Sequence, residues 1–475
     1  MNDITATTND PNDEWFENYP YDEIQVGQTA QTIRTLTLED IQAFAAVSGD
    51  TNPTHLDSAY AFDTPFHEIV GHSMWSGSLI SSLLGNELPG VGTVYQDQKL
   101  HFKLPVKLGD TLTVMIKALA KNNATKAVTF DCLVTNQRQE LVATGEATVL
   151  PPTVKVKREK IHAPKMQLFD PEARLKALLA LGEHLEPIAC GIVHPCEEGA
   201  LQGAIEAAEG GLIRPVLIGP KARIIGIANE HGLNLDAVEI VDTPHSHASA
   251  EIAAKMAAES QLEALMKGSL HTDEFMRAVV TNPALRTKRR ISHIWRFDVP
   301  LYSKPLLITD CAININPTLI EKVDIVQNAI ELAHVLGNPN PKVAILSAVE
   351  TITPTIASTL DAAALCKMAD RRQITGAVLD GPLAFDNAIS VEAARIKNID
   401  SPVAGQADIL IAPDLEAGNM IGKQLEYLGG ATSSGIVLGA RIPLALTSRA
   451  DGPAARMASA LLAKLMAHHY RTHKP

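Results

Sequence analysis

The chain has 475 residues and a mass of 50.9 kDa, and 46% of its residues are hydrophobic, so it can bury at least two sizeable cores. Its formal net charge of -13 argues against a nucleic-acid partner, because binding a phosphate backbone needs clustered lysine and arginine. Charged and polar residues interrupt the apolar runs well short of the roughly 18 residues of a membrane-spanning helix. We therefore expect two or three domains that act on small molecules, with no membrane partner.

The amino-terminal segment, residues 1–22, is acidic and contains no lysine or arginine. We expect a flexible acidic tail, because a targeting segment would have the opposite charge. The five cysteines include no Cys-x-x-Cys pair and lie in no histidine-rich spacing, which indicates neither a disulfide framework nor a metal site. These features predict a cytoplasmic protein without a metal.

The first motif that can carry chemistry is the run Ser48–His55, in which Asp50 and His55 lie five residues apart. Pro53 removes a backbone donor and restricts the residue before it, so we expect a turn rather than regular helix. Such a turn can direct the carboxylate and the imidazole at one water molecule, as proton transfer requires. An ordinary capped turn is the alternative, because its residue types are common in loops.

A segment without charge follows, in which small and apolar residues extend over Ser76–Gly85. It is predicted to be a buried helix that ends at glycine. Its amino end would offer unpaired N–H groups. Just before it, His72 is expected to be a packed or capping histidine rather than a second base.

Four motifs in this half resemble, in their order and spacing, the MaoC-like (R)-specific enoyl-CoA hydratases. They are Asp50-x-Asn52-Pro53-x-His55, the Gly-His-Ser-Met sequence before the predicted helix, Leu88–Thr93 and Phe102–Asp110. The resemblance covers roughly residues 25 to 150. It implies a hot-dog (α+β) domain over residues 23–150, in which an antiparallel sheet wraps a long helix.

The same resemblance implies roles for three residues. Asp50 and His55 would activate the water that adds to C3 of a trans-2-enoyl thioester, and one of them would supply the C2 proton. The backbone N–H of Ser73 would stabilise the enolate oxygen. Family members usually have glycine at this last position, and the hydroxymethyl group of Ser73 would narrow the thioester slot.

Composition changes at residues 151–168, which begin with two prolines and continue as a basic, unpatterned stretch that we interpret as an interdomain linker. Beyond residue 170, short apolar runs alternate with alanine-rich segments. This alternation predicts buried parallel strands joined by helices, the α/β class. The predicted strands are Ile188–Val193, Pro215–Gly219, Lys342–Ser347, Gly376–Asp380 and Ala407–Ala412.

Three later runs place small residues and carboxylates on expected strand-to-helix loops: Asp380–Ala388, Pro413–Met420 and Leu446–Asp451. In the last, Arg449 can hold a tetrahedral oxyanion through paired N–H groups, and Ser448 can donate to a carbonyl oxyanion. Taken singly, such loops are more often caps and turns.

In order and spacing these runs resemble the phosphate acetyl/butyryltransferase family, especially its butyryl-type members, over roughly residues 170 to 470. The agreement extends to Glu209–Gly219, Met266–Thr272, Leu285–Thr287 and Ser292-His293. The resemblance implies a two-subdomain α/β domain over residues 169–475. The family's reaction converts acyl-CoA and inorganic phosphate into acyl phosphate and CoA.

The resemblance also implies site residues. Ser448 and Arg449 would stabilise the tetrahedral transition state. Acetyl-type members use an aspartate to take the CoA thiol proton where this chain has Ala455. The identity of the general base is therefore open, and Asp451 is the nearest substitute. The candidates for contacts with phosphate or CoA are Arg277, Arg286, Asp380 and Asp451.

Together the two halves predict a bifunctional enzyme that hydrates short-chain trans-2-enoyl-CoA and transfers acyl groups between CoA and phosphate. No tightly bound cofactor is expected, because CoA thioesters and phosphate enter as substrates, and both families imply a homo-oligomer. Fold does not guarantee function, so two alternatives remain. The carboxyl-terminal half could be a non-catalytic acyl-CoA-binding or oligomerisation domain, or the amino-terminal half a thioester-binding module.

Overall fold

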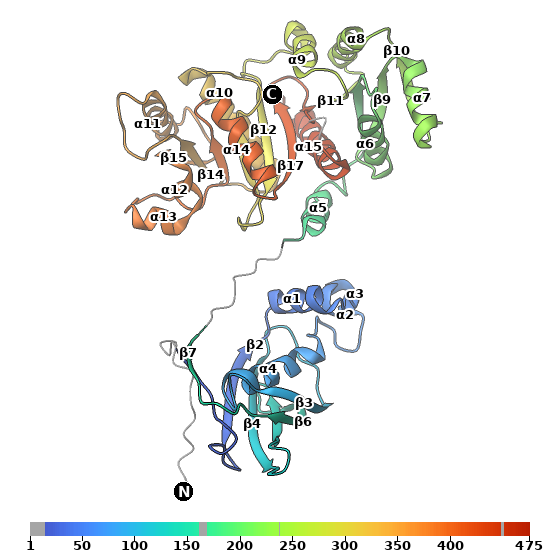
Figure 1. Ribbon diagram of the computed structural model, residues 1–475. Helices are drawn as coiled ribbons and strands as arrows, with labels where there is room; N and C mark the ends of the chain where they lie inside the picture. The colour runs from blue at the N-terminus through green and yellow to red at the C-terminus, as the bar shows by residue number, and fades with distance from the viewer. Residues whose placement is uncertain (1–14, 161–168, 237, 448–450) are drawn as a thin grey trace. The chain divides into compact units, whose positions relative to one another are not determined.

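The computed structural model describes residues 15–160, 169–236, 238–447 and 451–475. The chain divides into two compact units, residues 1–168 and residues 169–475 (Figure 1). We call them the amino-terminal unit and the carboxyl-terminal unit and describe each by itself.

The amino-terminal unit is an antiparallel five-stranded sheet with a helix packed on it (Figure 1). The strands, in the order in which they pair, are β2 (Thr29–Thr35), β4 (Thr111–Lys121), β5 (Val128–Thr135), β6 (Leu141–Leu150) and β3 (Val94–Phe102). The helices are α1 (Leu38–Ser48), α2 (Pro53–Leu56), α3 (Ser58–Phe62) and α4 (Ser73–Asn86).

The core of this unit lies between α4 and one face of the sheet. Alternate residues of β4 and β5 are buried, because successive side chains of a strand point to opposite faces. They pack against Ile80, Leu83 and Leu84 of α4. The predicted hot-dog arrangement is confirmed, and the helix begins at Ser73 rather than at Ser76.

A short two-stranded ribbon in this unit corrects the sequence prediction. β1 (Trp15–Glu17) pairs antiparallel with β7 (Lys157–Glu159), so both the expected flexible tail and the expected linker contain a strand. Beside this ribbon, Lys155 forms exposed ion pairs with Glu17 and Glu23. Neither the acidic amino-terminal segment nor the basic segment after Pro152 carries a strand pattern that predicts this pairing.

The carboxyl-terminal unit is built on an eleven-stranded sheet (Figure 1). In spatial order its strands are β10 (Glu239–Asp242), β9 (Ile213–Gly219), β8 (Ile188–Val193), β11 (Ala264–Lys267), β18 (Leu444–Ala445), β17 (Thr432–Leu438), β12 (Ser292–Asp298), β13 (Leu306–Thr309), β16 (Ile409–Ile411), β14 (Lys342–Leu346) and β15 (Val378–Leu383). All five predicted strands are present.

Two parallel blocks make up this sheet. The strands β10, β9, β8, β11 and β18 run parallel to one another, as do β13, β16, β14 and β15. The antiparallel strands β17 and β12 join the blocks. The predicted two-subdomain α/β fold is therefore confirmed, with one sheet shared by both subdomains.

Helices cover this sheet, and α15 packs against both blocks. Its Leu461 and Leu465 belong to the core around β8 and β9, and its Leu462 and Met466 belong to the core around β14 and β16. No helix within the described ranges is long and apolar enough to cross a membrane. The helices are α5 (Pro171–Ala180), α6 (Glu198–Glu209), α7 (Lys221–His231), α8 (Ser246–Ala258), α9 (Thr272–Thr281), the 3₁₀ helix η1 (Pro283–Leu285), α10 (Leu319–Val335), α11 (Ala357–Asp370), α12 (Phe385–Ile389), α13 (Val391–Ile396), α14 (Leu415–Tyr427) and α15 (Pro453–Thr472).

Candidate active sites

The loop that carries Asp50 is defined by caps at both of its ends. α1 ends at Gly49, which adopts a left-handed φ of 73° that glycine reaches without strain. Asn52 then caps α2, because its Oδ1 accepts from the Thr54 N–H at 3.1 Å. His55 therefore lies on a one-turn helix instead of the expected turn. Pro53 is tolerated there because the first helical position has no intrahelical acceptor for an N–H.

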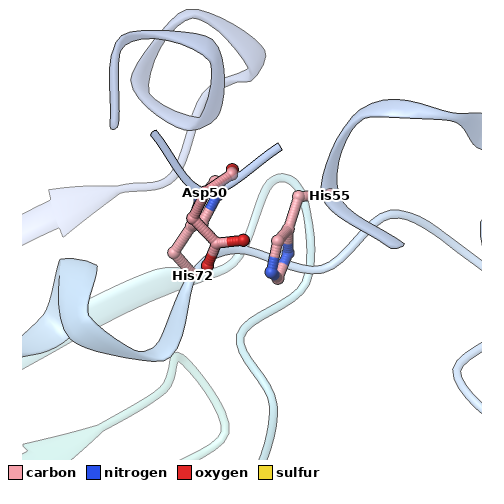
Figure 2. A group of neighbouring side chains, drawn as sticks. All are labelled: Asp50, His55 and His72. Carbon is pink, nitrogen blue, oxygen red and sulfur yellow. Dashed lines mark hydrogen bonds between the residues drawn. The ribbon is translucent and has the colours of Figure 1, made fainter. Parts of the chain in front are cut away.

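His55 is oriented with one ring nitrogen available. Its Nδ1 is 2.7 Å from the Val70 carbonyl oxygen, and since a carbonyl can only accept, the neutral ring carries its proton on Nδ1 and a lone pair on Nε2. The exposed Asp50 carboxylate points toward this ring (Figure 2). The structure thus brings together the carboxylate and the imidazole that the sequence predicted as a proton-transfer pair.

His72 packs behind this pair. Its Nε2 donates to the Asp50 carbonyl oxygen at 2.9 Å. Its ring packs against that of His55 with centroids 3.9 Å apart and a tilt of 33°. Only 3% of the residue is exposed, and its Nδ1 contacts no hydrogen-bond partner among the described residues. His72 is therefore packed, as expected, but its side chain does not cap α4.

Asp50, His55 and His72 also place potential metal-ligating atoms within 4.8 Å of one another. One carboxylate with two imidazoles is a known zinc-ligand set. Each ring directs its other nitrogen at a backbone carbonyl oxygen, His55 at Val70 and His72 at Asp50. The exposed Asp50 carboxylate beside His55 can also position a water molecule for proton transfer.

The amino end of α4 adjoins the same site through His72. Ser73 is the first residue of the helix and is exposed. First-turn N–H groups have no intrahelical acceptor, and the His72 side chain does not supply one. The backbone at Ser73 can therefore offer an N–H and the positive end of the helix dipole to a developing negative charge.

The carboxyl-terminal unit contains a cavity of about 330 Å³. It lies where the ends of β11 and β18 meet the first half of β12 and the helices α9 and α14. We call it the phosphate cavity, after the ligand that we propose for it. Its lining residues are Lys267, Leu270, His271, Thr272, His293, Trp295, Ala312, Asn419, Lys423, Leu446 and Thr447.

Positive charge dominates the phosphate cavity. Of the described residues that line it, Lys267 and Lys423 are cationic and none is an aspartate or a glutamate. Lys267 is buried and donates to the Leu270 carbonyl at 3.2 Å. Lys423 lies over the Trp295 ring at 5.3 Å and 3.0 Å from Glu426. A half-enclosed cavity with two ammonium groups is suited to an anion.

His293 supplies a neutral polar group to the phosphate cavity. Burial lowers its pKa to about 3, because an apolar environment disfavours the charged imidazolium. Its ring meets the Trp295 ring edge-on at 5.1 Å. At neutral pH this imidazole is uncharged, and with so low a pKa it is too weak a base to take a thiol proton.

Two of the predicted transferase residues, Ser448 and Arg449, lie outside the described residues. Thr447, which precedes them, lines the phosphate cavity, and its Oγ1 accepts from Arg456 Nη1 at 3.1 Å. Leu446 lines it as well. The chain therefore enters the Ser-Arg motif from the wall of this cavity.

The other four candidates do not line the phosphate cavity. Arg277 is exposed on α9, and Arg286 is exposed with its Nε bonded to a backbone carbonyl. Asp380 lies within the edge strand β15, which continues beyond the predicted strand end, and its carboxylate accepts from the Gly381 N–H. Asp451 lines a different cavity.

Several residues of this cavity received no role from the sequence. Lys267 and Asn419 stand in runs that carried the family resemblance, and Lys423 follows Asn419 by one helical turn on α14, a spacing that places both on one face. The sequence around these three residues could therefore have marked them as site residues. Nothing in the sequence marks Trp295, because it reaches the cavity through the pairing of β12 with β17.

Comparison with known proteins agrees with this division. Residues 246–463 match the family model described as "Phosphate acetyl/butaryl transferase", and residues 22–137 match "MaoC like domain". The phosphate acetyltransferase of Rhizobium meliloti is 57% identical over 295 residues, which are 62% of this chain and 93% of that protein. Both matches to family models fall where the sequence predicted them.

Two solved structures are also similar. A branched-chain phosphotransacylase from Enterococcus faecalis V583 matches with a TM-score of 0.53 and 30% identity, covering 59% of this chain and 99% of that one. The R-hydratase PhaJ1 from Pseudomonas aeruginosa matches with a TM-score of 0.32 and 42% identity, covering 33% of this chain and 99% of that one. The predicted fusion and the prediction of an enzyme are confirmed. This chain belongs to the phosphate acetyl/butyryltransferase family and carries a MaoC-like domain at its amino-terminal end.

Proposed function

We propose that the carboxyl-terminal unit transfers short acyl groups between CoA and inorganic phosphate. The observation that carries this proposal is the phosphate cavity, where two lysines and no described acidic side chain surround a space next to Thr447. The identity of 57% to a phosphate acetyltransferase supports it. An anionic nucleophile such as phosphate needs this charge to approach a CoA thioester.

The geometry supports a direct displacement. Lys267 and Lys423 hold the phosphate while one of its oxygens attacks the thioester carbonyl carbon, and the CoA thiolate leaves. Ser448 and Arg449 are proposed to stabilise the tetrahedral oxyanion. Because a thiolate is a fair leaving group, with a thiol pKa near 8.5, this direction needs no strong acid. Neither Ala455 nor the neutral His293 supplies a base for the reverse reaction.

We propose that the amino-terminal unit hydrates short-chain trans-2-enoyl-CoA. The lone pair on His55 Nε2 accepts a proton from the water that adds to C3, and the Asp50 carboxylate orients that water. The Ser73 N–H stabilises the enolate oxygen, and the protonated His55 returns the proton to C2. The MaoC-like match supports a hydratase-type function.

One experiment tests both proposals on the full chain. Crotonyl-CoA and butyryl-CoA are each incubated with phosphate, hydration is followed by loss of enoyl absorbance, and acyl phosphate is trapped with hydroxylamine. We expect Asp50→Asn to lower hydration by roughly 10² to 10⁴ and leave acyl phosphate formation unchanged. Lys267→Met should lower acyl phosphate formation and leave hydration unchanged.

The controls separate the alternatives. If hydration proceeds but no acyl phosphate forms from any short acyl-CoA, the carboxyl-terminal unit is a binding or assembly domain. If acyl phosphate forms but crotonyl-CoA is not hydrated, the amino-terminal unit only binds thioesters. Neither reaction as proposed uses a tightly bound cofactor.

We infer that the protein forms a homo-oligomer in a reducing compartment, the cytoplasm. β3 is an edge strand of its sheet and exposes Val94, Tyr95 and Phe102, and an apolar edge strand favours pairing with a second copy. All five cysteines are free. Light scattering on the purified chain tests the oligomer, and a monomeric mass at micromolar concentration would contradict it.

A further inference from the structure

Trp295 is the largest apolar side chain that lines the phosphate cavity. Leu270, Ala312 and Leu446 add further apolar surface to the lining. Trp295 is 9% exposed, so a ligand in the cavity can touch part of its indole ring. The transfer reaction proposed above uses the lysines of this cavity and gives its apolar surface no role.

The phosphate cavity is too small to enclose a whole acyl-CoA. Its volume of about 330 Å³ is at the lower end of the range for small-molecule sites, roughly 300 to 1,000 Å³. The nucleotide and most of the pantetheine arm of CoA must therefore lie outside it. The acyl end of the thioester and the phosphate share the interior, so the apolar surface of the cavity meets the acyl group.

Trp295 adjoins the part of the chain that leads into the Ser-Arg motif. It is directly opposite Gly435 in the β12–β17 ladder. A Cβ on Gly435 would lie 3.4 Å from Trp295 Cδ1 and 2.6 Å from the Leu446 carbonyl oxygen, so the indole ring and the backbone after β18 meet at this glycine. Thr447, which follows Leu446, lines the same cavity. An acyl group whose carbonyl lies beside this segment therefore has the indole ring within reach of its hydrocarbon chain.

The indole ring is held at both of its ends. Its pyrrole end packs on Gly435, and its benzene end packs on Gly422 of α14, where a Cβ would lie 2.4 Å from Cε3 and 2.5 Å from Cζ3. Lys423 lies over the ring at 5.3 Å, and the His293 ring meets it edge-on at 5.1 Å. A side chain packed on several sides moves only at the cost of strain in its neighbours. Trp295 is therefore a rigid wall of the cavity.

Lys423 connects this wall to the proposed phosphate position. Its ammonium group, which lies over the Trp295 ring, is one of the two that hold the phosphate in the proposed reaction. The nucleophile and the acyl group are then adjacent, as a direct displacement requires. A long acyl chain would have to displace either the phosphate or the rigid ring, and both are unfavourable.

We propose that Trp295 sets the upper limit of acyl chain length in the carboxyl-terminal unit, so that butyryl-CoA is a substrate and octanoyl-CoA is not. The butyryl chain packs on the indole ring, Leu270 and Leu446, and the ring blocks a longer chain. This inference rests on the proposed transferase function and names the residue that selects its substrates.

The test measures kcat/KM of the full chain for acetyl-CoA, butyryl-CoA and octanoyl-CoA with saturating phosphate. These saturated thioesters have no double bond for the amino-terminal unit to hydrate. We expect the wild type to prefer butyryl-CoA over octanoyl-CoA by on the order of 100-fold, because a closed apolar pocket rejects extra methylene groups. Trp295→Leu shortens the wall and should reduce this preference to about tenfold or less.

Two further variants separate a local effect from a general loss of packing. Phe275→Leu is the matched control, because Phe275 is a buried aromatic residue of the same unit that does not line the cavity, and it should leave the preference unchanged. Ala312→Leu acts in the opposite direction. It adds volume to the lining and should lower kcat/KM for butyryl-CoA relative to acetyl-CoA by about tenfold.

A binding measurement decides the proposal without turnover. The chain has three tryptophans, so Trp15→Phe with Trp75→Phe leaves Trp295 as the only fluorescent indole. The probes are S-butyl-CoA and S-octyl-CoA, thioethers that phosphate cannot cleave. We expect S-butyl-CoA to change Trp295 fluorescence at a concentration at which S-octyl-CoA does not.

The outcomes distinguish this proposal from the proposed function. A wild type that forms no acyl phosphate from any of the three thioesters would contradict the transferase function, and the fluorescence measurement would still decide the length limit. An unchanged preference in Trp295→Leu, or the same change in Phe275→Leu, would overturn the role of Trp295. Equal fluorescence changes from the two thioethers would do so as well, whether or not Trp295→Leu folds.

Discussion

His55 and His72, whose rings pack against each other in the amino-terminal unit, are held in the same way. Each directs one ring nitrogen at a backbone carbonyl, His55 at Val70 and His72 at Asp50. The first bond leaves the His55 Nε2 lone pair free to act as a base. The second holds the backbone of Asp50, so His72 acts on the reaction as a positioning residue.

We expect His72→Phe to lower kcat for crotonyl-CoA hydration by about tenfold, because small losses of alignment between reacting groups are costly. The phenyl ring keeps the ring contact with His55 but cannot donate to the Asp50 carbonyl. His72→Gln, which keeps an N–H donor, should recover part of the rate. Equal losses in the two variants, with acyl phosphate formation unchanged in both, would show that the hydrogen bond is unimportant.

His293 makes the stability of the carboxyl-terminal unit depend on pH. Its pKa is about 3 in the folded protein and near 6.5 when unfolded. As the pH falls below 6.5, the unfolded chain binds a proton that the folded chain does not, so stability is fully present above 6.5 and is lost toward 3. The slope is about 1.4 kcal/mol per pH unit.

Lowering the pH from 7 to 5 should therefore reduce the unfolding free energy of this unit in both proteins. We expect the reduction to be about 2 kcal/mol smaller in His293→Gln than in the wild type. Denaturant titrations at both pH values, followed by Trp295 fluorescence with Trp15 and Trp75 replaced by phenylalanine, measure the difference. Parallel pH dependence in the two proteins would mean that His293 is not buried as the structure places it.

At the scale of elements, the hot-dog sheet depends on one glycine in β6. Gly145 pairs with Cys132 on one side and with Leu100 on the other. A Cβ at this position would lie 1.8 Å from the Lys99 carbonyl oxygen, which belongs to the backbone of β3 and cannot move aside. The close pairing of β3 with β6 therefore requires a residue without a side chain.

Gly145→Ala should destabilise the amino-terminal unit by roughly 3 kcal/mol or more, because relief of the clash must shift β3. Gly85→Ala is the matched control in the same unit. Gly85 lies in α4 with no described neighbour within 4 Å of its would-be Cβ, and alanine there should stabilise the helix by up to about 1 kcal/mol. Thermal unfolding of both variants checks the sign of each change.

At the scale of the whole molecule, one chain joins two units whose proposed reactions share the acyl-CoA. A tether raises the local concentration of a product near the second site without any new contact. The chain can therefore shorten the delay between hydration and acyl transfer even if the two sites never touch.

We expect the intact protein to form acyl phosphate from crotonyl-CoA with a shorter lag than an equimolar mixture of Asp50→Asn and Ser448→Ala full chains. Each variant keeps one site, so the mixture is compared at equal active-site concentration. The advantage should grow as the protein is diluted, because only the mixture depends on encounters in solution. Equal lags at every dilution would show that the tether gives no advantage.

The sequence by itself determined the class of each unit and the elements with strong local patterns. The strand Ile188–Val193 was predicted with its observed bounds because a short apolar run between turns is a local signal. Asp50 and His55 were predicted together because only five positions separate them. Motif order was sufficient to predict both families, since it does not depend on how distant segments pack.

Only the tertiary structure decided which distant residues share a site. Lys267, Trp295 and Asn419 meet in the phosphate cavity through pairing across the sheet and the packing of α14. The pairing of β1 with β7 likewise had no signal in either segment alone. The physical reason is that local periodicity reports the burial of a face, whereas a cavity is set by the side chains that several elements leave unfilled between them.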